Sequence, residues 1–194
     1  MVSILLKNNN TEVIVSLIEN MGELIKIVGG PSIEDKIIPA ITTPAADKTW
    51  RIRLAAVQFF PKLALTVGRD LFQAKLQNVI LGMLMDPVFT IRETALESLI
   101  EISKNSQTQE WLLSLMLPKL SEFSRHERFM IRIQAVHFVN KLATDATKDV
   151  LNKNLMETVL ALGEDPVPNI RFNVCKTIDA FYPKMTPGNK IKSE

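Results

Sequence analysis

Apolar side chains recur in steps of three and four residues along most of this chain, in stretches that start at a nearly constant spacing. Each of four stretches opens with an isoleucine followed by an arginine, and these arginines lie 39, 40 and 39 residues apart: Arg53, Arg92, Arg132 and Arg171. Steps of three and four place side chains on one face of an α-helix. The pattern therefore predicts four amphipathic helices in equivalent positions of a repeating unit.

The same stripe continues one period towards the N-terminus. Ile14 lies 39 residues before Arg53, and the matching positions around it are all apolar: Val13, Leu17, Ile18, Met21 and Leu24. Further apolar runs precede the four arginine stripes, at 37–41, 76–84, 112–120 and 151–162. Each run is predicted to form the first helix of a hairpin whose second helix carries the arginine.

A period of this length, built from helix pairs, is typical of stacked helical hairpins. We predict an all-α, right-handed α-solenoid of about four hairpins preceded by a half repeat, in one continuous domain. Pro61 is expected to kink a second helix, and Pro39 and Pro118 to bend first helices. The predicted segments are a half repeat at 1–28, repeats at 29–67, 68–105, 106–145 and 146–182, and a flexible tail at 183–194.

An aspartate precedes three of the four arginines by six residues, and His126 occupies that place before Arg132. Asp86 and Asp165 are followed by proline, so we predict that they cap the next helix, with the proline as its first residue. Stacking is expected to align the charged residues as a structural ladder between turns: Asp47, Arg53, Asp86, Arg92, Arg132, Asp165 and Arg171. We expect the array to be locally less rigid where the ladder is interrupted, at His126 and at Asn8 with Ile14.

Composition narrows the functional classes. The 23 Lys and Arg residues nearly balance 21 Asp and Glu residues, for a net charge of +2, which is too even for a dedicated nucleic-acid or membrane surface. The single cysteine, Cys175, excludes internal disulfides and favours a reducing compartment. The first residues lack a secretion signal, and no stretch approaches the ~20 apolar residues of a membrane span. We expect a cytoplasmic protein, with the nucleus as a further candidate compartment.

The residues of catalysis are not grouped. His126 and His137 are 11 residues apart without clustered acids, so they suggest neither a metal site nor a catalytic triad. Cys175 falls on a core stripe and is expected to pack as a small hydrophobic residue. No glycine-rich phosphate loop occurs. We predict that the chain is not an enzyme and needs no metal or cofactor.

Three segments carry a resemblance to a known family: DKTWRIRLA at 47–55, DPVFTIRETA at 86–95 and EDPVPNIRFNVCK at 164–176. The hairpin with Asp in the turn and Arg opening the second helix resembles a HEAT repeat, an armadillo-like helical unit. The segments, in this order, are similar to the C-terminal repeats of the scaffold (A) regulatory subunit of type 2A serine/threonine protein phosphatase, over about residues 12–182. The resemblance implies a non-catalytic scaffold. In that family the C-terminal repeats hold the catalytic subunit through the turns, and the N-terminal repeats hold a regulatory subunit.

The resemblance thus implies that the turns bind a partner, namely a phosphatase catalytic subunit; the second candidate partner is a regulatory subunit. Exposed aromatic and arginine side chains commonly dominate binding energy. The alternative is that the aromatics pack against the preceding helix as a hydrophobic staple. The turn at 124–131 departs from the Asp-Pro pattern. The predicted partner-binding residues are Trp50, Arg51, Val88, Phe89, Arg128, Phe129, Val167 and Pro168.

Other functions stay open. A transport-receptor-like HEAT adaptor would bind peptides on the inner helix faces and would not depend on Trp50. A nucleic-acid binder would need aligned basic residues and steep salt dependence. Neither terminal repeat has the polar outer face that closes a solenoid, which suggests part of a longer array, covered ends or a truncated, non-functional copy.

Overall fold

The computed structural model describes residues 10–27, 32–145 and 153–182. Every regular element in these ranges is a helix, so the predicted all-α class is confirmed. The chain divides into two compact units, Met1–Ile102 and Ser103–Glu194, and each is a stack of helical hairpins of the α-solenoid type. The predicted flexible tail and the proposed substitution of Asn8 for a turn aspartate lie outside the described residues.

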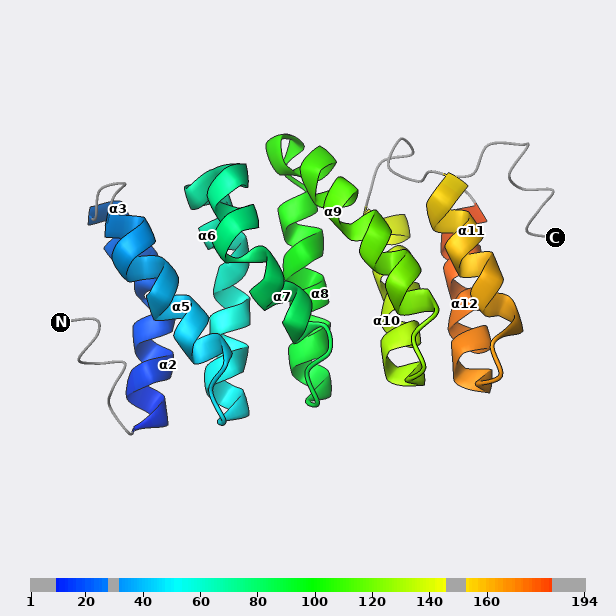
Figure 1. Ribbon diagram of the computed structural model, residues 1–194, viewed down its shortest axis with the longest axis horizontal. Helices are drawn as coiled ribbons and strands as arrows, with labels where there is room; N and C mark the ends of the chain where they lie inside the picture. Colours follow the sequence, from blue (N-terminus) through cyan, green and yellow to red (C-terminus); the bar gives the residue numbers. More distant parts are fainter. Residues whose placement is uncertain (1–9, 28–31, 146–152, 183–194) are drawn as a thin grey trace. The chain divides into compact units, whose positions relative to one another are not determined.

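Unit 1 contains two layers of helices (Figure 1). The second helices, α2, α6 and α8, form one layer, and the first helices, α5 and α7, form the other. A short helix α3 continues from α2, and a π-helical turn precedes α5. In chain order the elements are α2 (Thr11–Glu19), α3 (Met21–Ile27), the π-helical turn (Ile33–Ile37), α5 (Ile38–Ala45), α6 (Trp50–Lys75), α7 (Gln77–Met83) and α8 (Phe89–Ser103).

The long helix α6 joins two hairpins, and its interruption lies at a glycine. The backbone leaves helical geometry at Gly68 (φ 76°, ψ 176°) and not at Pro61, the predicted position of the kink. That conformation is essentially restricted to glycine, because a Cβ would clash with the backbone. Gly68 therefore ends the second helix of one hairpin and lets the chain start the first helix of the next.

Unit 2 repeats the two-layer arrangement. Its first helices are α9 (Ser106–Ser124) and α11 (Lys153–Ala161), and its second helices are α10 (Phe129–Asp145) and α12 (Pro168–Phe181). A 3-10 turn at Leu162–Glu164 follows α11. Helix α9 continues through Pro118, whose missing N–H leaves one carbonyl of the preceding turn without its helical donor.

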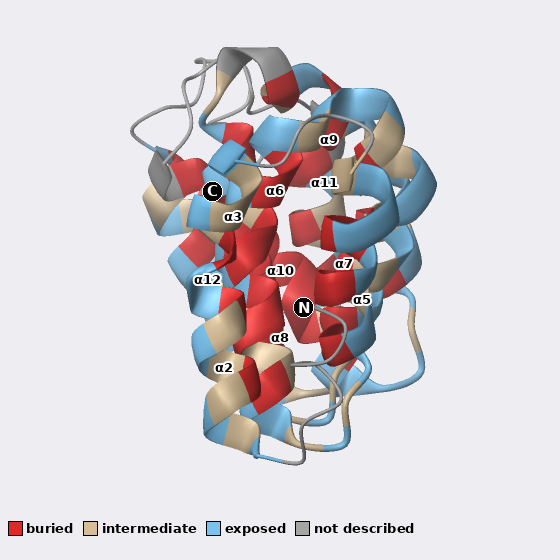
Figure 2. Ribbon diagram, turned by 90° about the vertical axis from the view of Figure 1, so that its left-hand side faces the viewer, coloured by how far each residue is buried: buried red, intermediate tan, exposed pale blue. Residues whose placement is uncertain are grey.

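The core of each unit lies where the two layers meet, and Figure 2 shows the buried positions on the helix faces turned towards one another. All five stripe positions are buried on α6, α8 and α10; those of α10 are Ile131, Ala135, Val136, Val139 and Leu142. The helical period in the sequence therefore identifies the core face of these helices.

The last stripe differs, and the expectation for Cys175 was wrong. Cys175 is exposed, whereas Val136, its equivalent on α10, is fully buried. The equivalent position faces the next second helix, and α10 has α12 on that side. Burial at this position thus depends on a following layer.

None of the helices in the described ranges is both long and apolar enough to cross a membrane.

Candidate protein-binding turns

Each turn between a first and a second helix is organised by one side chain. In three turns an aspartate Oδ1 accepts a hydrogen bond from the amide two residues later: Thr49 to Asp47 (2.7 Å), Val88 to Asp86 (2.8 Å) and Val167 to Asp165 (2.9 Å). In the fourth turn, Nδ1 of His126 accepts the same bond from the amide of Arg128 (3.0 Å). Such Asx-type turns fix the backbone locally.

This geometry corrects the predicted capping. The aspartates are not helix caps, because the Asx-type turn places two further residues before the helix. Val167, with extended dihedral angles, is the N-cap of α12, and Pro168 rather than Pro166 is the first helical residue. The helices consequently begin at the residues three before each arginine, namely Trp50, Phe89, Phe129 and Pro168.

Each arginine then folds back onto its own turn. Its Nη1 donates to two successive turn carbonyls; for Arg92 these belong to Asp86 (2.6 Å) and Pro87 (3.0 Å). Arg53, Arg132 and Arg171 make the equivalent pair of bonds in their own turns. Hydrogen bonds from a charged donor are stronger than neutral ones, so the turn is held rigidly against the start of its helix.

Two arginines also reach the aspartate of the next turn. Arg53 donates from Nε to Asp86 Oδ2 (2.8 Å) and from Nη2 to Oδ1 (3.0 Å) within unit 1. Arg132 does the same to Asp165 within unit 2 (2.6 and 3.0 Å). The bonds from Arg132 lower the pKa of Asp165, against the opposing effect of burial, and the same contact raises the pKa of Arg132.

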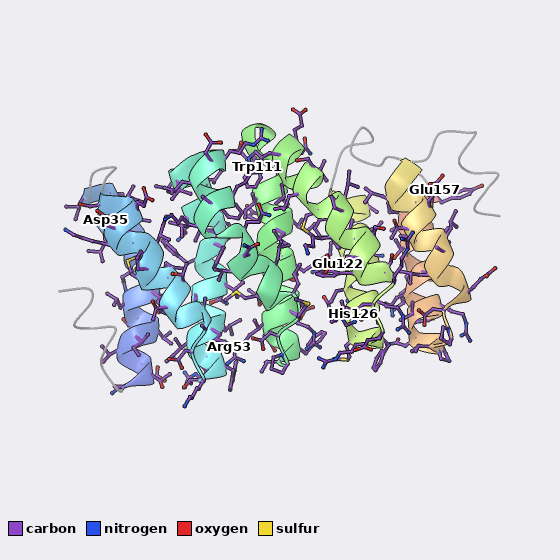
Figure 3. All side chains as sticks on the ribbon, in the orientation of Figure 1. Asp35, Arg53, Trp111, Glu122, His126 and Glu157 are labelled. Carbon is purple, nitrogen blue, oxygen red and sulfur yellow. The ribbon has the colours of Figure 1, made fainter. Side chains whose placement is uncertain are left out.

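Among the residues that the structure describes, no such second contact is found for the other two arginines. Arg92 is buried, and its Nε has no hydrogen-bond acceptor in the described part of the chain. Arg171 is exposed at the start of α12. Figure 3 labels Arg53 near the start of α6 and His126 just before α10, which locates the turn ends of these helices.

The clamped turns present large apolar side chains to solvent. Trp50, Phe89 and Phe129 are 46%, 54% and 42% exposed, so they are not packed away as staples. Arg51, Arg128 and Pro168 are also exposed, while Val88 and Val167 are half-buried. In unit 1 the Arg53–Asp86 contact joins the Trp50 turn to the Phe89 turn, and we call residues 48–51 with 85–89 the unit-1 turn edge.

Two exposed methionines at these turns were not predicted. Met85 immediately precedes Asp86, and Met130 follows Phe129. The sequence signal for Met85 was an apolar residue directly before the turn aspartate. The third turn has Arg125 at the equivalent position. Methionine is flexible and polarizable, and it suits surfaces that adapt to a partner.

Two further features of the described surface concern metal binding and a cleft. In the ranges that the structure covers, no three His, Cys, Asp or Glu side chains are placed to hold a metal ion. A cleft of about 590 Å³ opens between α9 and α11, lined by Ser121, Ser124, Arg125, Glu157 and Thr158 among apolar residues. Its lining contains neither histidine nor cysteine.

Comparisons with known proteins agree with a repeat scaffold. A sequence model of the PIK3R4-like middle domain matches residues 1–166. The A-type regulatory subunit of protein phosphatase PP2A from Schizosaccharomyces pombe is 33% identical over 73 residues, 38% of this chain and 12% of that protein. Importin subunit beta-2 of the same organism is 29% identical over 108 residues, 51% of this chain and 12% of that protein.

Among solved structures, the crystal structure of Cex1p superposes with a TM-score of 0.70 at 14% identity, over 94% of this chain and 35% of that chain. This likeness bears on the fold alone. The chain spans only 12% of the length of each of the two relatives, so their whole-protein functions do not transfer directly.

Proposed function

Because the chain belongs to the PIK3R4-like middle-domain family and is built as a HEAT-repeat scaffold, we propose that it is a non-catalytic adaptor that binds a protein along its hairpin turns. The proposed partner is the catalytic subunit of a serine/threonine protein phosphatase. Similarity to the A-type regulatory subunit of PP2A supports this choice. A regulatory subunit is a second candidate partner, and any phosphoester chemistry would belong to the phosphatase.

One observation carries the proposal: the unit-1 turn edge holds large apolar side chains outside the core on a rigid frame. Trp50 and Phe89 are the first residues of neighbouring second helices, and the turn before each is fixed by its Asx-type bond and arginine clamp. A surface that is already ordered loses little conformational entropy on binding. Exposed Trp and Phe on such a frame are suited to act as anchors.

The charged side chains near Trp50 and Phe89 indicate which groups the partner surface should carry. Lys48 and Arg51 are exposed on the unit-1 turn edge. Arg51 forms a 2.8 Å surface ion pair with Glu12, which a stronger carboxylate contact can replace. The complementary partner surface therefore has apolar pockets flanked by Asp or Glu, to which Arg can bind in a bidentate manner.

The test is direct binding to a purified phosphatase catalytic subunit, measured by titration calorimetry. Trp50→Ala with Phe89→Ala should abolish detectable binding, since truncating one anchor costs ≥2 kcal/mol, or about 30-fold in Kd. The matched control is Leu65→Ala, similarly exposed but on α6 about 20 Å from Trp50 along the helix. Binding that survives the double substitution would remove the turn-edge proposal.

A second function is favoured by the helix faces of unit 1. Glu93, Glu97 and Glu101 are exposed at four-residue intervals on α8, and such a face suits a basic peptide. A transport-receptor-like adaptor would use this face, in keeping with the similarity to importin subunit beta-2. It would lose affinity for a Lys/Arg-rich peptide on Glu93→Lys with Glu97→Lys, and would be indifferent to Trp50→Ala.

A further inference from the structure

Helix α12 carries an exposed stripe along one side. Phe172, Cys175, Asp179 and Tyr182 follow one another in steps of three, four and three, which places them on a single helix face. Phe172 is 58% exposed, the largest exposed aromatic fraction in the described residues, and Tyr182 and Cys175 are also exposed. This is an apolar face with one carboxylate in its middle.

The equivalent side of α10 shows what such a face is built to contact. Ile133, Val136 and Ala143 occupy the positions of Phe172, Cys175 and Tyr182, and all three are buried. The fourth residue, Asn140, donates from Nδ2 to Oγ1 of Thr177 on α12 (3.2 Å). This side of a second helix is therefore the side that the following second helix covers.

The covering surface is a recognisable stripe as well. On α12 it consists of Ile170, Val174, Thr177 and Phe181, all buried. The same positions on α2 and the start of α3 are occupied by Val13, Leu17, Asn20 and Leu24, which are half-buried or exposed. On α6 the four equivalent residues, Ile52, Ala56, Phe59 and Leu63, are buried. Helix α2 thus presents, partly uncovered, the kind of surface that packs onto α10.

We propose that the exposed stripe of α12 docks against α2 of a second copy of this chain, so that copies associate head to tail. The contact continues the packing of α12 on α10, in the same register. Phe172, Cys175 and Tyr182 would cover Val13, Leu17 and Leu24 of the second copy. Since the two surfaces differ, each copy keeps one of each, and association proceeds head to tail into open chains or closed rings rather than into a two-fold symmetric dimer.

Polar groups match in this register. Asn20 uses one N–H of its side-chain amide on the carbonyl of Ser16 (2.7 Å), and an amide has two. The second N–H would donate to Asp179, as Asn140 donates to Thr177 in the existing contact. The match extends the apolar contact with a hydrogen bond to a charged acceptor.

Charge is complementary as well. Glu12 and Arg51, at identical positions of neighbouring second helices, form an ion pair, which shows that such positions are within reach of each other. The same logic pairs Lys176 of one copy with Glu19 of the next, and both side chains are exposed. Lys176 now lies 4.4 Å from the centre of the Phe172 ring, beside the exposed stripe.

The experiment is sedimentation of the 194-residue chain over about a hundredfold range of concentration. The average mass should rise with concentration, and Phe172→Glu should raise the dissociation constant of the assembly by at least about tenfold. Phe172 is exposed, so its replacement leaves the fold intact, which an unchanged thermal transition would show. The matched control is Phe89→Glu, similarly exposed on the unit-1 turn edge, which should leave self-association unchanged.

A charge exchange makes the register testable. Lys176→Glu or Glu19→Lys alone should weaken association, and the two together should restore it. Cys175, at the centre of the stripe, serves as a reporter whose reaction with a thiol reagent should slow as concentration rises. A monomer at every concentration, an assembly unaffected by Phe172→Glu, or a double exchange without rescue would each overturn the proposal. None of these results bears on phosphatase binding, which uses the turns.

Discussion

The two hairpin turns of unit 2 are each shaped by a side chain that accepts a backbone amide, but the side chains differ. Only the turn before α12 also contacts the other second helix of unit 2. Before α12, Asp165 accepts the amide of Val167 through Oδ1 and the guanidinium of Arg132 through both oxygens. Before α10, His126 accepts the amide of Arg128 through Nδ1. Shaping the turn needs one acceptor, whereas joining turns needs a second acceptor and a negative charge, which a carboxylate has and a neutral imidazole lacks.

The arginines reflect the same difference. Arg132 and Arg92 both clamp the carbonyls of their own turns through Nη1. Of these two, Arg132 has carboxylate oxygens on Nε and Nη2, while Nε of the buried Arg92 has no acceptor among residues that the structure describes. The HEAT-type turn therefore contains two separable sets of interactions: the arginine clamp on its own turn, and the ion pair between neighbouring layers.

The largest expected effect on stability comes from replacing Arg132, and comparison with Arg92 separates the clamp from the contact between layers. Arg132→Met should lower the free energy of unfolding by about 3 kcal/mol, because it leaves the nearly buried carboxylate of Asp165 without its cation. Arg92→Met loses two carbonyl bonds but removes an unsatisfied buried donor, so about 1 kcal/mol is expected. Urea unfolding of both variants measures the contrast. Equal losses would show that the clamp alone matters.

A second substitution converts one turn into the other. Asp165→His keeps an acceptor for the amide of Val167, as His126 provides in its own turn, but removes the contact with Arg132. We expect a loss of about 2 kcal/mol in the free energy of unfolding, less than for Asp165→Ala, which also loses the turn acceptor. If Asp165→His matches the unchanged protein, the contact between layers contributes nothing.

A structural feature could be predicted from the sequence when it is set by residues close to it in the chain. The period and the core stripes follow from apolar spacing alone, and the arginines near the starts of α6, α8, α10 and α12 are read directly from the sequence. The stripe around Arg132, for example, is buried at every predicted position. The helix starts were misplaced by two residues, because an Asx-type turn and an N-cap both suit an aspartate and only backbone geometry separates them.

Burial that depends on a neighbouring layer could not be predicted from the sequence. Cys175 lies on a correct helical stripe, yet its burial depends on what packs beside α12 and not on the pattern within α12. Contacts between turns, by contrast, were expected from the stacking of the repeats, and Arg53 does reach Asp86, 33 residues on. The partner-binding residues stay predictions, since exposure of Trp50 and Phe89 permits binding without identifying what binds.

Acid should weaken the contact between layers selectively. The pKa of Asp165 is lowered in the folded protein, so its carboxylate stabilises the fold above the unfolded value of about 3.9, and this stability is lost as the pH falls through the folded pKa. The difference in unfolding free energy between the unchanged protein and Asp165→Asn should therefore shrink below about pH 4. Unfolding at a series of pH values measures it. A difference that stays constant would assign the stabilisation to shape rather than charge.

The smallest expected effect on stability tests the side-chain acceptor of a turn by itself. His126→Ala removes the acceptor for the amide of Arg128, and since this turn is largely exposed, water replaces part of the bond. A loss of about 0.5–1 kcal/mol in the free energy of unfolding is expected. His126→Asn supplies a side-chain oxygen at a similar reach and should restore most of it. If alanine and asparagine behave alike, the turn before α10 is held by the Arg132 clamp and the imidazole is dispensable, which would make the clamp the primary device in every turn.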